Sequence, residues 1–411
     1  MSQKRALLIG GAIAALLAIG IVAFVVVRQA PESSGLDSKL DGVEQPKKAG
    51  KPGKAPVRRR SETCWVTYGR NAERTSDAST IELGVPKTKE WGIRIKALME
   101  FPPSICDRAL YVNDADGYTW RINSRTGKKI WKKKTGTIFD STPLIHGPYI
   151  IVGGKDKHVT ALDLLTGKRL WRMKTGGPVE SSPVAFGNDI IVASLDRRVY
   201  SLDVVTGKVK WAYRTGGEIK GSPVISGSTI YTANYAGEVI ALNAKNGKLR
   251  WRKAYRLDPV RTERIYSSTP VSNGSVIFGT VGGYVYSLNK KNGRQKWKYE
   301  VGGAYVYSTP AIARETVFVG DFNGTLHAIR QKSGKRRWTA KVGGPISGSP
   351  LVVGKNVYVS SIKGGTWAFD IRTGKRVWKS KYGKYVPGIA TNRRFYFTQN
   401  GLLSAWNAGK Q

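Results

Sequence analysis

The sequence predicts an all-β protein: an eight-bladed β-propeller of four-stranded antiparallel blades, preceded by one transmembrane helix. Tryptophan recurs about every 40 residues, and each interval holds four short β-rich runs separated by Gly, Asn and Asp. A long uncharged run near the N-terminus predicts the helix. The 12 Trp and 40% hydrophobic residues exclude a disordered polyampholyte despite a net charge of +40, and the 2 Cys exclude a disulfide scaffold.

The predicted helix covers residues 6–27, a run of 22 residues without a charge that is long enough to span a bilayer. A cleaved signal peptide has a shorter apolar core and small residues at its exit, where this chain has Arg28. A lipoprotein needs a cysteine directly after the run, but the nearest is Cys64. We therefore expect residues 1–28 to form a cytoplasmic stub and an uncleaved single-pass anchor. The rest of the chain is then extracytoplasmic, at the cell membrane.

Residues 29–76 are predicted to link the anchor to the propeller. Residues 30–60 contain four prolines and a basic tract with no acid between its members. This tract consists of Lys47, Lys48, Lys51, Lys54, Arg58, Arg59 and Arg60. Because like charges repel and prolines stiffen a chain, we expect a tether that holds the propeller away from the membrane and can contact polyanions. The alternative is a solvated spacer with no specific ligand.

The repeat is marked by eight tryptophans. They are Trp91, Trp131, Trp171, Trp211, Trp251, Trp297, Trp338 and Trp378. Seven of them end a motif of Thr, Asn or Ser, then Gly, a basic residue, two further residues and Trp, as in Thr206-Gly207-Lys208 to Trp211. Within that period the runs 182–185, 190–194, 199–203 and 209–213 alternate with turn residues. Four antiparallel strands in about 40 residues are typical of a propeller blade.

The number of copies predicts how the ring closes. The turn before the third strand occurs eight times, and its last copy, near Gly401, has no tryptophan strand after it. Conversely, Trp91 has no three inner strands before it. The two fragments complete each other, so residues 77–411 are expected to form eight blades, the last closed by the N-terminal strand around Trp91. Such sharing leaves no free sheet edge at the junction.

Together, Ser-Ser-Pro-Val at 181–184, the turn at Asp196, Leu202-Asp203 and the Thr-Gly-Lys-x-x-Trp motif resemble the pyrroloquinoline quinone-like (PQQ-like) propeller repeat. The resemblance covers about residues 77–411. The segment 64–71 is similar to the lead-in of membrane-anchored actinobacterial members. The resemblance implies the fold but not an activity, because this repeat serves quinoprotein dehydrogenases and also non-catalytic propellers such as the outer-membrane assembly lipoprotein.

The dehydrogenases that this repeat resembles hold their quinone against a disulfide between adjacent cysteines, with calcium bound by Glu and Asn beside an Asp base. Here the cysteines are Cys64 and Cys106, 42 positions apart. His146, His158 and His327 do not have metal-ligand spacing. We therefore expect a non-catalytic, extracytoplasmic scaffold without a cofactor. The alternative is a quinone-dependent oxidoreductase that uses the channel mouth.

Three carboxylates are predicted to meet at that mouth. The position three residues before the inner-strand proline is Glu100, Asp140 and Glu180 in three consecutive blades. Carboxylate oxygens suit a hard cation, so these residues are a candidate calcium site. The alternative is that they are solvated loop carboxylates that neutralise nearby lysines.

A candidate partner surface lies on the same face. The interval between Trp251 and Trp297 holds six extra residues within 254–267. Together with the next connection, this insertion offers an arginine and tyrosine cluster of the kind favoured at protein interfaces. Its members are Arg256, Arg261, Arg264, Tyr266, Tyr305 and Tyr307. An insertion that arose by drift is the alternative.

The opposite face is expected to be basic, because every Gly-basic turn lies there. Outside the cytoplasm this charge favours an anionic cell-envelope polymer or membrane head groups, whereas the sequence has no nucleic-acid recognition motif. Basicity that serves only solubility is the alternative. In an oxidising exterior Cys64 and Cys106 can form a disulfide that stabilises the fold by about 4 kcal/mol. Two free thiols are the alternative.

Overall fold

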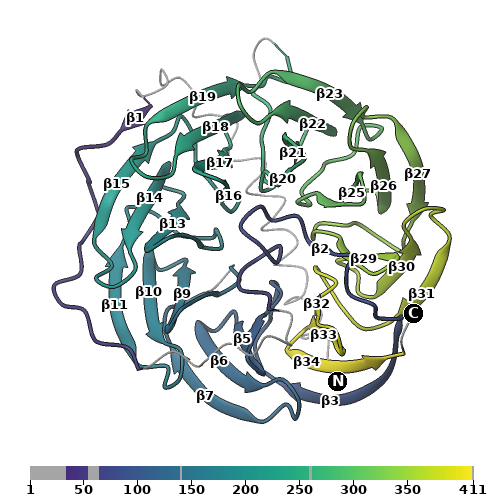
Figure 1. The fold of residues 1–411 in the computed structure, drawn as a ribbon, viewed down its shortest axis with the longest axis horizontal. Coiled ribbons are helices and arrows are strands. Elements are labelled where there is room, and N and C mark those ends of the chain that lie inside the picture. The colour runs from purple at the N-terminus through teal and green to yellow at the C-terminus, as the bar shows by residue number, and fades with distance from the viewer. Residues whose placement is uncertain (1–33, 54–63, 139–140, 259–261, 410–411) are drawn as a thin grey trace, which may run out of the picture. The chain divides into compact units, whose positions relative to one another are not determined.

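The computed structural model describes residues 34–53, 64–138, 141–258 and 262–409, and residues 35–411 form one compact unit. Eight sheets follow one another in chain order around a central axis (Figure 1). The predicted all-β, eight-bladed propeller is confirmed. Within the described ranges no helix is long and apolar enough to cross a membrane. The predicted anchor at residues 6–27 lies outside them.

The first four blades each have four antiparallel strands in sequence order from the axis outward. Blade 1 contains β4 (Ser104–Cys106), β5 (Ala109–Asn113), β6 (Tyr118–Asn123) and β7 (Lys129–Lys134). Blade 2 contains β8 (Leu144–His146), β9 (Tyr149–Gly154), β10 (His158–Asp163) and β11 (Arg169–Lys174). Blade 3 contains β12 (Val184–Phe186), β13 (Asp189–Ala193), β14 (Arg198–Asp203) and β15 (Val209–Arg214). Blade 4 contains β16 (Val224–Ser226), β17 (Thr229–Ala233), β18 (Glu238–Asn243) and β19 (Leu249–Ala254).

Blades 5 to 7 repeat this plan, and blade 8 is shared between the two ends of the propeller. Blade 5 contains β20 (Val271–Ser272), β21 (Ser275–Gly279), β22 (Tyr284–Asn289) and β23 (Gln295–Glu300). Blade 6 contains β24 (Ala311–Ala313), β25 (Thr316–Gly320), β26 (Thr325–Arg330) and β27 (Arg336–Lys341). Blade 7 contains β28 (Leu351–Val353), β29 (Asn356–Ser360), β30 (Thr366–Asp370) and β31 (Arg376–Ser380). Blade 8 contains β32 (Ile389–Ala390), β33 (Arg394–Gln399), β34 (Leu402–Ala408) and β3 (Pro86–Arg94).

The ring closes as the sequence predicts. Strand β3 pairs with β34 in antiparallel register, with Trp91 opposite Ala405 and Lys89 opposite Trp406. The indole of Trp91 also donates a hydrogen bond of 3.2 Å to the carbonyl oxygen of Ser124 in blade 1. The N-terminal strand therefore completes blade 8 and contacts the next blade.

The tryptophan and glycine of the repeat motif join neighbouring blades. Seven of the eight repeat tryptophan rings lie against the Gly of the turn between the third and fourth strands of the next blade, and each of these glycines has a positive φ near 70°. The seven pairs are Trp91–Gly127, Trp131–Gly167, Trp171–Gly207, Trp211–Gly247, Trp251–Gly293, Trp297–Gly334 and Trp338–Gly374. The motif recurs because the ring of one blade occupies the space that a side chain would fill in the next.

Gly247→Ala is expected to lower the free energy of unfolding by about 3 kcal/mol, because backbone strain and overpacking add. The new Cβ would lie 2.6 Å from the Trp211 ring at a φ of 70°. Gly227→Ala is the matched control in the same blade: its φ is 60° and nothing lies within 4 Å of the added Cβ. We expect this control to lose about 1 kcal/mol. Urea unfolding measures the stability of both variants. Equal losses of unfolding free energy would contradict a role for the contact between Gly247 and the Trp211 indole.

Residues 35–53, here called the strap, lie along the rim of the ring rather than forming a free tether. Strand β1 (Gly35–Leu36) adds to the outer edge of β15 in blade 3. Further on, Glu44 forms an antiparallel bridge with Lys174 of β11 in blade 2. The amide of Gly50 then donates a 2.7 Å hydrogen bond to the carbonyl oxygen of Leu170. The purple trace in Figure 1 follows these outer strands.

Side chains also hold the strap in place. Asp37 accepts a 2.6 Å hydrogen bond from Arg198, whose side chain is only 4% exposed. Leu40, Val43 and Ala49 pack against the apolar core between blades 2 and 3. Residues 35–53 and 64–76, which the sequence assigns to the linker before residue 77, lie in the same compact unit as the blades. In residues 35–53, backbone pairing to exposed strand edges overrides the polar, proline-containing composition.

Candidate functional site

The centre of the ring is filled by residues 64–78, here called the central segment. Figure 1 shows it as the dark blue trace inside the blades, ending at β2 (Asp77–Ala78), which pairs in parallel with β28 of blade 7. The central segment makes hydrogen bonds to the innermost strand region of all eight blades. In blade order the bonded pairs are Trp65–Ile105, Val66–Ile145, Thr67–Pro183, Ala72–Ile225, Glu73–Val271, Thr75–Ile312, Ser76–Val352 and Trp65–Ala390.

Arg74 is the most deeply buried cation of this segment, with no exposed surface. Its Nε donates to the carbonyl oxygen of Pro223 at 2.8 Å, Nη1 donates to that of Tyr68 at 2.7 Å, and Nη2 donates to that of Ser182 at 2.7 Å. Burial lowers the pKa of the guanidinium to about 9. The side chain therefore joins the central segment to blades 3 and 4 through carbonyl oxygens.

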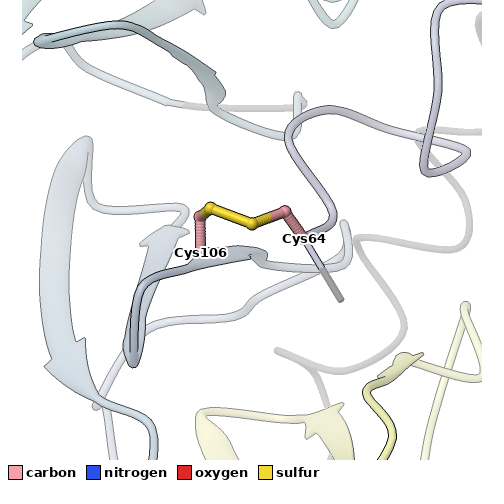
Figure 2. The surroundings of a disulfide bond; sticks show 2 residues. All are labelled: Cys64 and Cys106. Carbon is pink, nitrogen blue, oxygen red and sulfur yellow. A yellow bond between two sulfur atoms is a disulfide. The ribbon is translucent and has the colours of Figure 1, made fainter. Parts of the chain in front are cut away.

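The two cysteines form a disulfide, with their Cα atoms 4.6 Å apart (Figure 2). Cys106 is the last residue of β4 in blade 1, and Cys64 directly precedes Trp65 of the central segment. The bond therefore fixes the start of the central segment to the innermost strand of blade 1.

The three predicted cation ligands are only partly described. Glu180 is engaged by lysines, with Nζ of Lys220 at 2.9 Å and Nζ of Lys155 at 3.7 Å from its carboxylate oxygens. Burial is the main cause of the raised pKa of Tyr385, and the negative charge of Glu100 raises this pKa further. Asp140 lies outside the described residues. Within those residues no group of three or more His, Cys, Asp or Glu side chains is placed to hold a metal ion. The calcium site stays a prediction.

The described residues do not fit the quinone site implied by the resemblance to quinoprotein dehydrogenases. That site needs a disulfide between adjacent cysteines, but Cys64 and Cys106 are bonded to each other across 42 positions. It also needs carboxylates free for calcium, whereas the carboxylate of Glu180 pairs with Lys220. The centre of the ring is occupied by the chain itself.

The predicted tyrosines do come together, and two further aromatic residues join them. We call the set the aromatic cluster: Tyr235, Tyr266, Tyr305, Tyr307 and Phe322. The ring centroids of Tyr235 and Tyr266 are 4.4 Å apart, and those of Tyr266 and Tyr307 are 5.0 Å apart. Tyr307 is 5.3 Å from Phe322 and 5.8 Å from Tyr305. Tyr305 is 49% exposed, so the cluster reaches the surface.

Burial sets the chemistry of these phenols. It raises the pKa of Tyr307 to about 12 and also raises the pKa of Tyr235. Both hydroxyls therefore remain protonated near neutral pH and can donate hydrogen bonds. The charge of Arg264 has the opposite effect and lowers the pKa of Tyr307. This exposed cation therefore lies beside the cluster. Arg256 lies in a short bridge with Thr262, and Arg261 is outside the described residues.

Tyr235 and Phe322 are not among the residues predicted from the sequence, and they lie in turns between second and third strands. The amide of Phe322 donates to the carbonyl oxygen of Tyr305, and the amide of Tyr235 donates to that of Glu218. The same turn-to-connection bond recurs in other blades, for example from Leu195. Aligning this turn position across the repeats would have revealed the aromatic residues at 235 and 322.

The opposite ends of the strands carry the basic turns. Antiparallel hairpins alternate between the two ends, so these turns lie on the face away from the aromatic cluster. Seven exposed cations, here called the basic ring, follow the motif glycines: Lys128, Lys168, Lys208, Lys248, Arg294, Lys335 and Lys375. The molecule thus separates an aromatic face from a basic one.

Comparison with known proteins supports the fold. A sequence model described as "Outer membrane protein assembly factor BamB" matches residues 86–178, 155–380 and 302–404. No curated protein sequence matches the chain.

Three solved structures share the architecture. BamB from Moraxella catarrhalis has a TM-score of 0.65 and 16% identity, covering 78% of this chain and 99% of its own. A europium-containing methanol dehydrogenase has a TM-score of 0.66 and 16% identity, covering 82% and 87%. The quinohemoprotein alcohol dehydrogenase from Comamonas testosteroni has a TM-score of 0.68 and 14% identity, covering 85% and 81%. At these identities the likeness shows the fold alone.

Proposed function

Because the chain belongs to the family described as outer membrane protein assembly factor BamB, we propose that it is a non-catalytic scaffold that binds a protein partner. In this proposal residues 6–27 hold the propeller at the extracytoplasmic side of the cell membrane. The family description, which names an assembly factor rather than an enzyme, supports the proposal.

The observation that carries the proposal is the aromatic cluster. It combines Tyr305, which is 49% exposed, with the partly buried rings of Tyr307 and Phe322 and the exposed Arg264. Tyrosine and arginine anchors that sit on a rigid base carry much of the binding energy at protein interfaces. The rings rest on turns and connections of blades 4 to 6, so the surface is largely formed before binding.

A photocrosslinker tests this surface in the native cell. We expect an incorporated benzoylphenylalanine at Tyr305 to give a discrete protein adduct, and the same residue at Val205 to give none. Val205 is 51% exposed and lies in a basic-face turn, so it controls for accessibility. Against the partner identified in this way, Tyr305→Ala is expected to weaken binding at least about tenfold. Equal adducts from the two positions, or none from Tyr305, would contradict the proposal.

An anionic envelope polymer is a second candidate partner, because the basic ring offers seven exposed cations on one face. Such binding predicts retention on isolated cell walls that decreases as salt is raised. Retention that is insensitive to salt would count against it.

Quinone-dependent oxidation at the channel mouth is the competing function, since two quinoprotein dehydrogenases share the fold. The ion pair between Glu180 and Lys220 and the spacing of the cysteines favour the scaffold. Purified protein incubated with pyrroloquinoline quinone and calcium is expected to show no bound quinone absorbance after gel filtration. Stoichiometric retention of the quinone would favour the enzyme.

A further inference from the structure

An open groove of about 470 Å³ lies on the rim of the ring, where the strap crosses the outer strand β11 of blade 2. Pro46 and Trp171 are buried there and give the groove an apolar base. Four cationic side chains line it: Lys47 and Lys48 from the strap, and Arg169 and Arg172 from β11. This groove is distinct from the aromatic cluster and from the centre of the ring.

The groove carries more positive charge than the acids beside it neutralise. Asp156 accepts a 2.5 Å hydrogen bond from Arg172, so these two charges compensate each other. Glu44 pairs in the same way with Lys174 at 2.5 Å. The Lys174 hydrogen bond lowers the pKa of Glu44, and the charge of Lys47 adds a smaller contribution.

The three remaining cations have no such partner. Among the described residues no carboxylate forms an ion pair with Lys47, Lys48 or Arg169. All three are exposed, two on the strap and one on β11. Lysine and arginine donors that line one groove together with buried apolar residues suit a phosphate group that is esterified to an apolar body.

The course of the strap indicates where such a phosphate comes from. Only residues 28–34 separate the predicted anchor from the start of β1 at Gly35. Seven extended residues span at most about 25 Å. The strap is fixed to the rim by the Asp37–Arg198 ion pair, so in a protein anchored as proposed this connection limits how far the rim of blades 2 and 3 can lie from the membrane surface.

We propose that this groove binds the phosphate of an anionic phospholipid head group and thereby holds the propeller with the rim of blades 2 and 3 against the membrane. The inference rests on the membrane anchor of the proposed function. A basic side chain at an anionic membrane surface improves binding about fivefold. Loss of three such side chains is therefore expected to be readily measurable.

The test uses the full-length protein in micelles of a neutral detergent. Calorimetry measures binding of dihexanoyl phosphatidylglycerol, dihexanoyl phosphatidylcholine and inorganic phosphate. We expect the phosphatidylglycerol to bind, with an affinity that falls at least about tenfold in the triple variant Lys47→Gln, Lys48→Gln, Arg169→Gln. The control variant Lys291→Gln, Lys332→Gln, Arg337→Gln removes the same charge from exposed positions on blades 5 and 6 and is expected to bind like the wild type.

Three results would overturn the proposal. Equal weakening in both triple variants would show a diffuse charge effect rather than a groove. Binding of inorganic phosphate but not of the phosphatidylglycerol would assign the groove to a free anion. Equal binding of the two lipids would remove the role of the head-group charge. Alkali extraction of native membranes tests the anchor separately, so failure of the anchor and failure of the groove are distinguishable.

Discussion

Arg74→Met is expected to lower the free energy of unfolding by about 3–5 kcal/mol. The substitution keeps the length of the side chain but removes the donors to the carbonyl oxygens of Pro223, Tyr68 and Ser182. Those oxygens stay buried without that donor, and each such loss costs about 1–3 kcal/mol. Urea unfolding of the full-length chain measures the change as a lower midpoint at an unchanged slope.

Arg70→Met is the matched control for this substitution. Arg70 lies in the same central segment and also has a positive φ, 76° against 53° for Arg74. It is only partly buried, and the described bond from its guanidinium goes to the carbonyl oxygen of Asp77. We expect a loss of about 1 kcal/mol. If the two variants lost equal stability, burial of Arg74 among carbonyl oxygens would not be the source of the effect.

The second large effect concerns the disulfide. The double variant Cys64→Ser, Cys106→Ser is expected to lose about 2–4 kcal/mol of unfolding free energy, because the bond closes a loop of 42 positions in the unfolded chain. We expect a loss at or below the value of about 4 kcal/mol that loop entropy alone gives. The hydrogen bonds between Trp65 and Ile105 still hold the start of the central segment when the disulfide is absent. Calorimetric melting of oxidised wild type and variant measures the difference.

Reductant provides the control for this prediction. Wild-type protein treated with dithiothreitol is expected to melt like the double variant, and the variant itself is expected not to respond. A wild type that melts at the same temperature with and without reductant would contradict a stabilising bond. A double variant that matches the oxidised wild type would do the same.

The repeat and its closure could be predicted because they depend on side chains at fixed spacing. The indole of Trp211 occupies the space that a side chain at Gly247 in the next blade would fill. A tryptophan and a glycine therefore recur together with the period of the fold. The position of Trp91 beside the last sheet followed from counting incomplete copies, and the pairing of β3 with β34 confirms it.

The strap and the central segment could not be predicted in the same way. Many of their contacts are backbone hydrogen bonds, such as those from Gly50 to Leu170 and from Ile225 to Ala72, and these require no particular side chain. In the strap, proline, lysine and glycine therefore favoured a linker where the chain pairs with exposed strand edges.

The candidate site was predicted in part. Tyr266, Tyr305 and Tyr307 follow from the insertion and the connection after it, and their rings do meet. Tyr235 and Phe322 come from turns between second and third strands, a position that recurs in every repeat, so an alignment of the repeats could have added them.

The central segment precedes every blade in the chain, so we expect it to influence the order in which the blades fold. It leaves the exit tunnel before any complete blade, and its residues then meet the innermost strands of blades 1 to 7 in the order in which those strands are translated. Strand β34 follows β3 by about 300 residues, so at about 5–20 residues per second the nascent ring stays open for about 15–60 s. We expect the segment to act during that interval as an internal template on which each new blade docks.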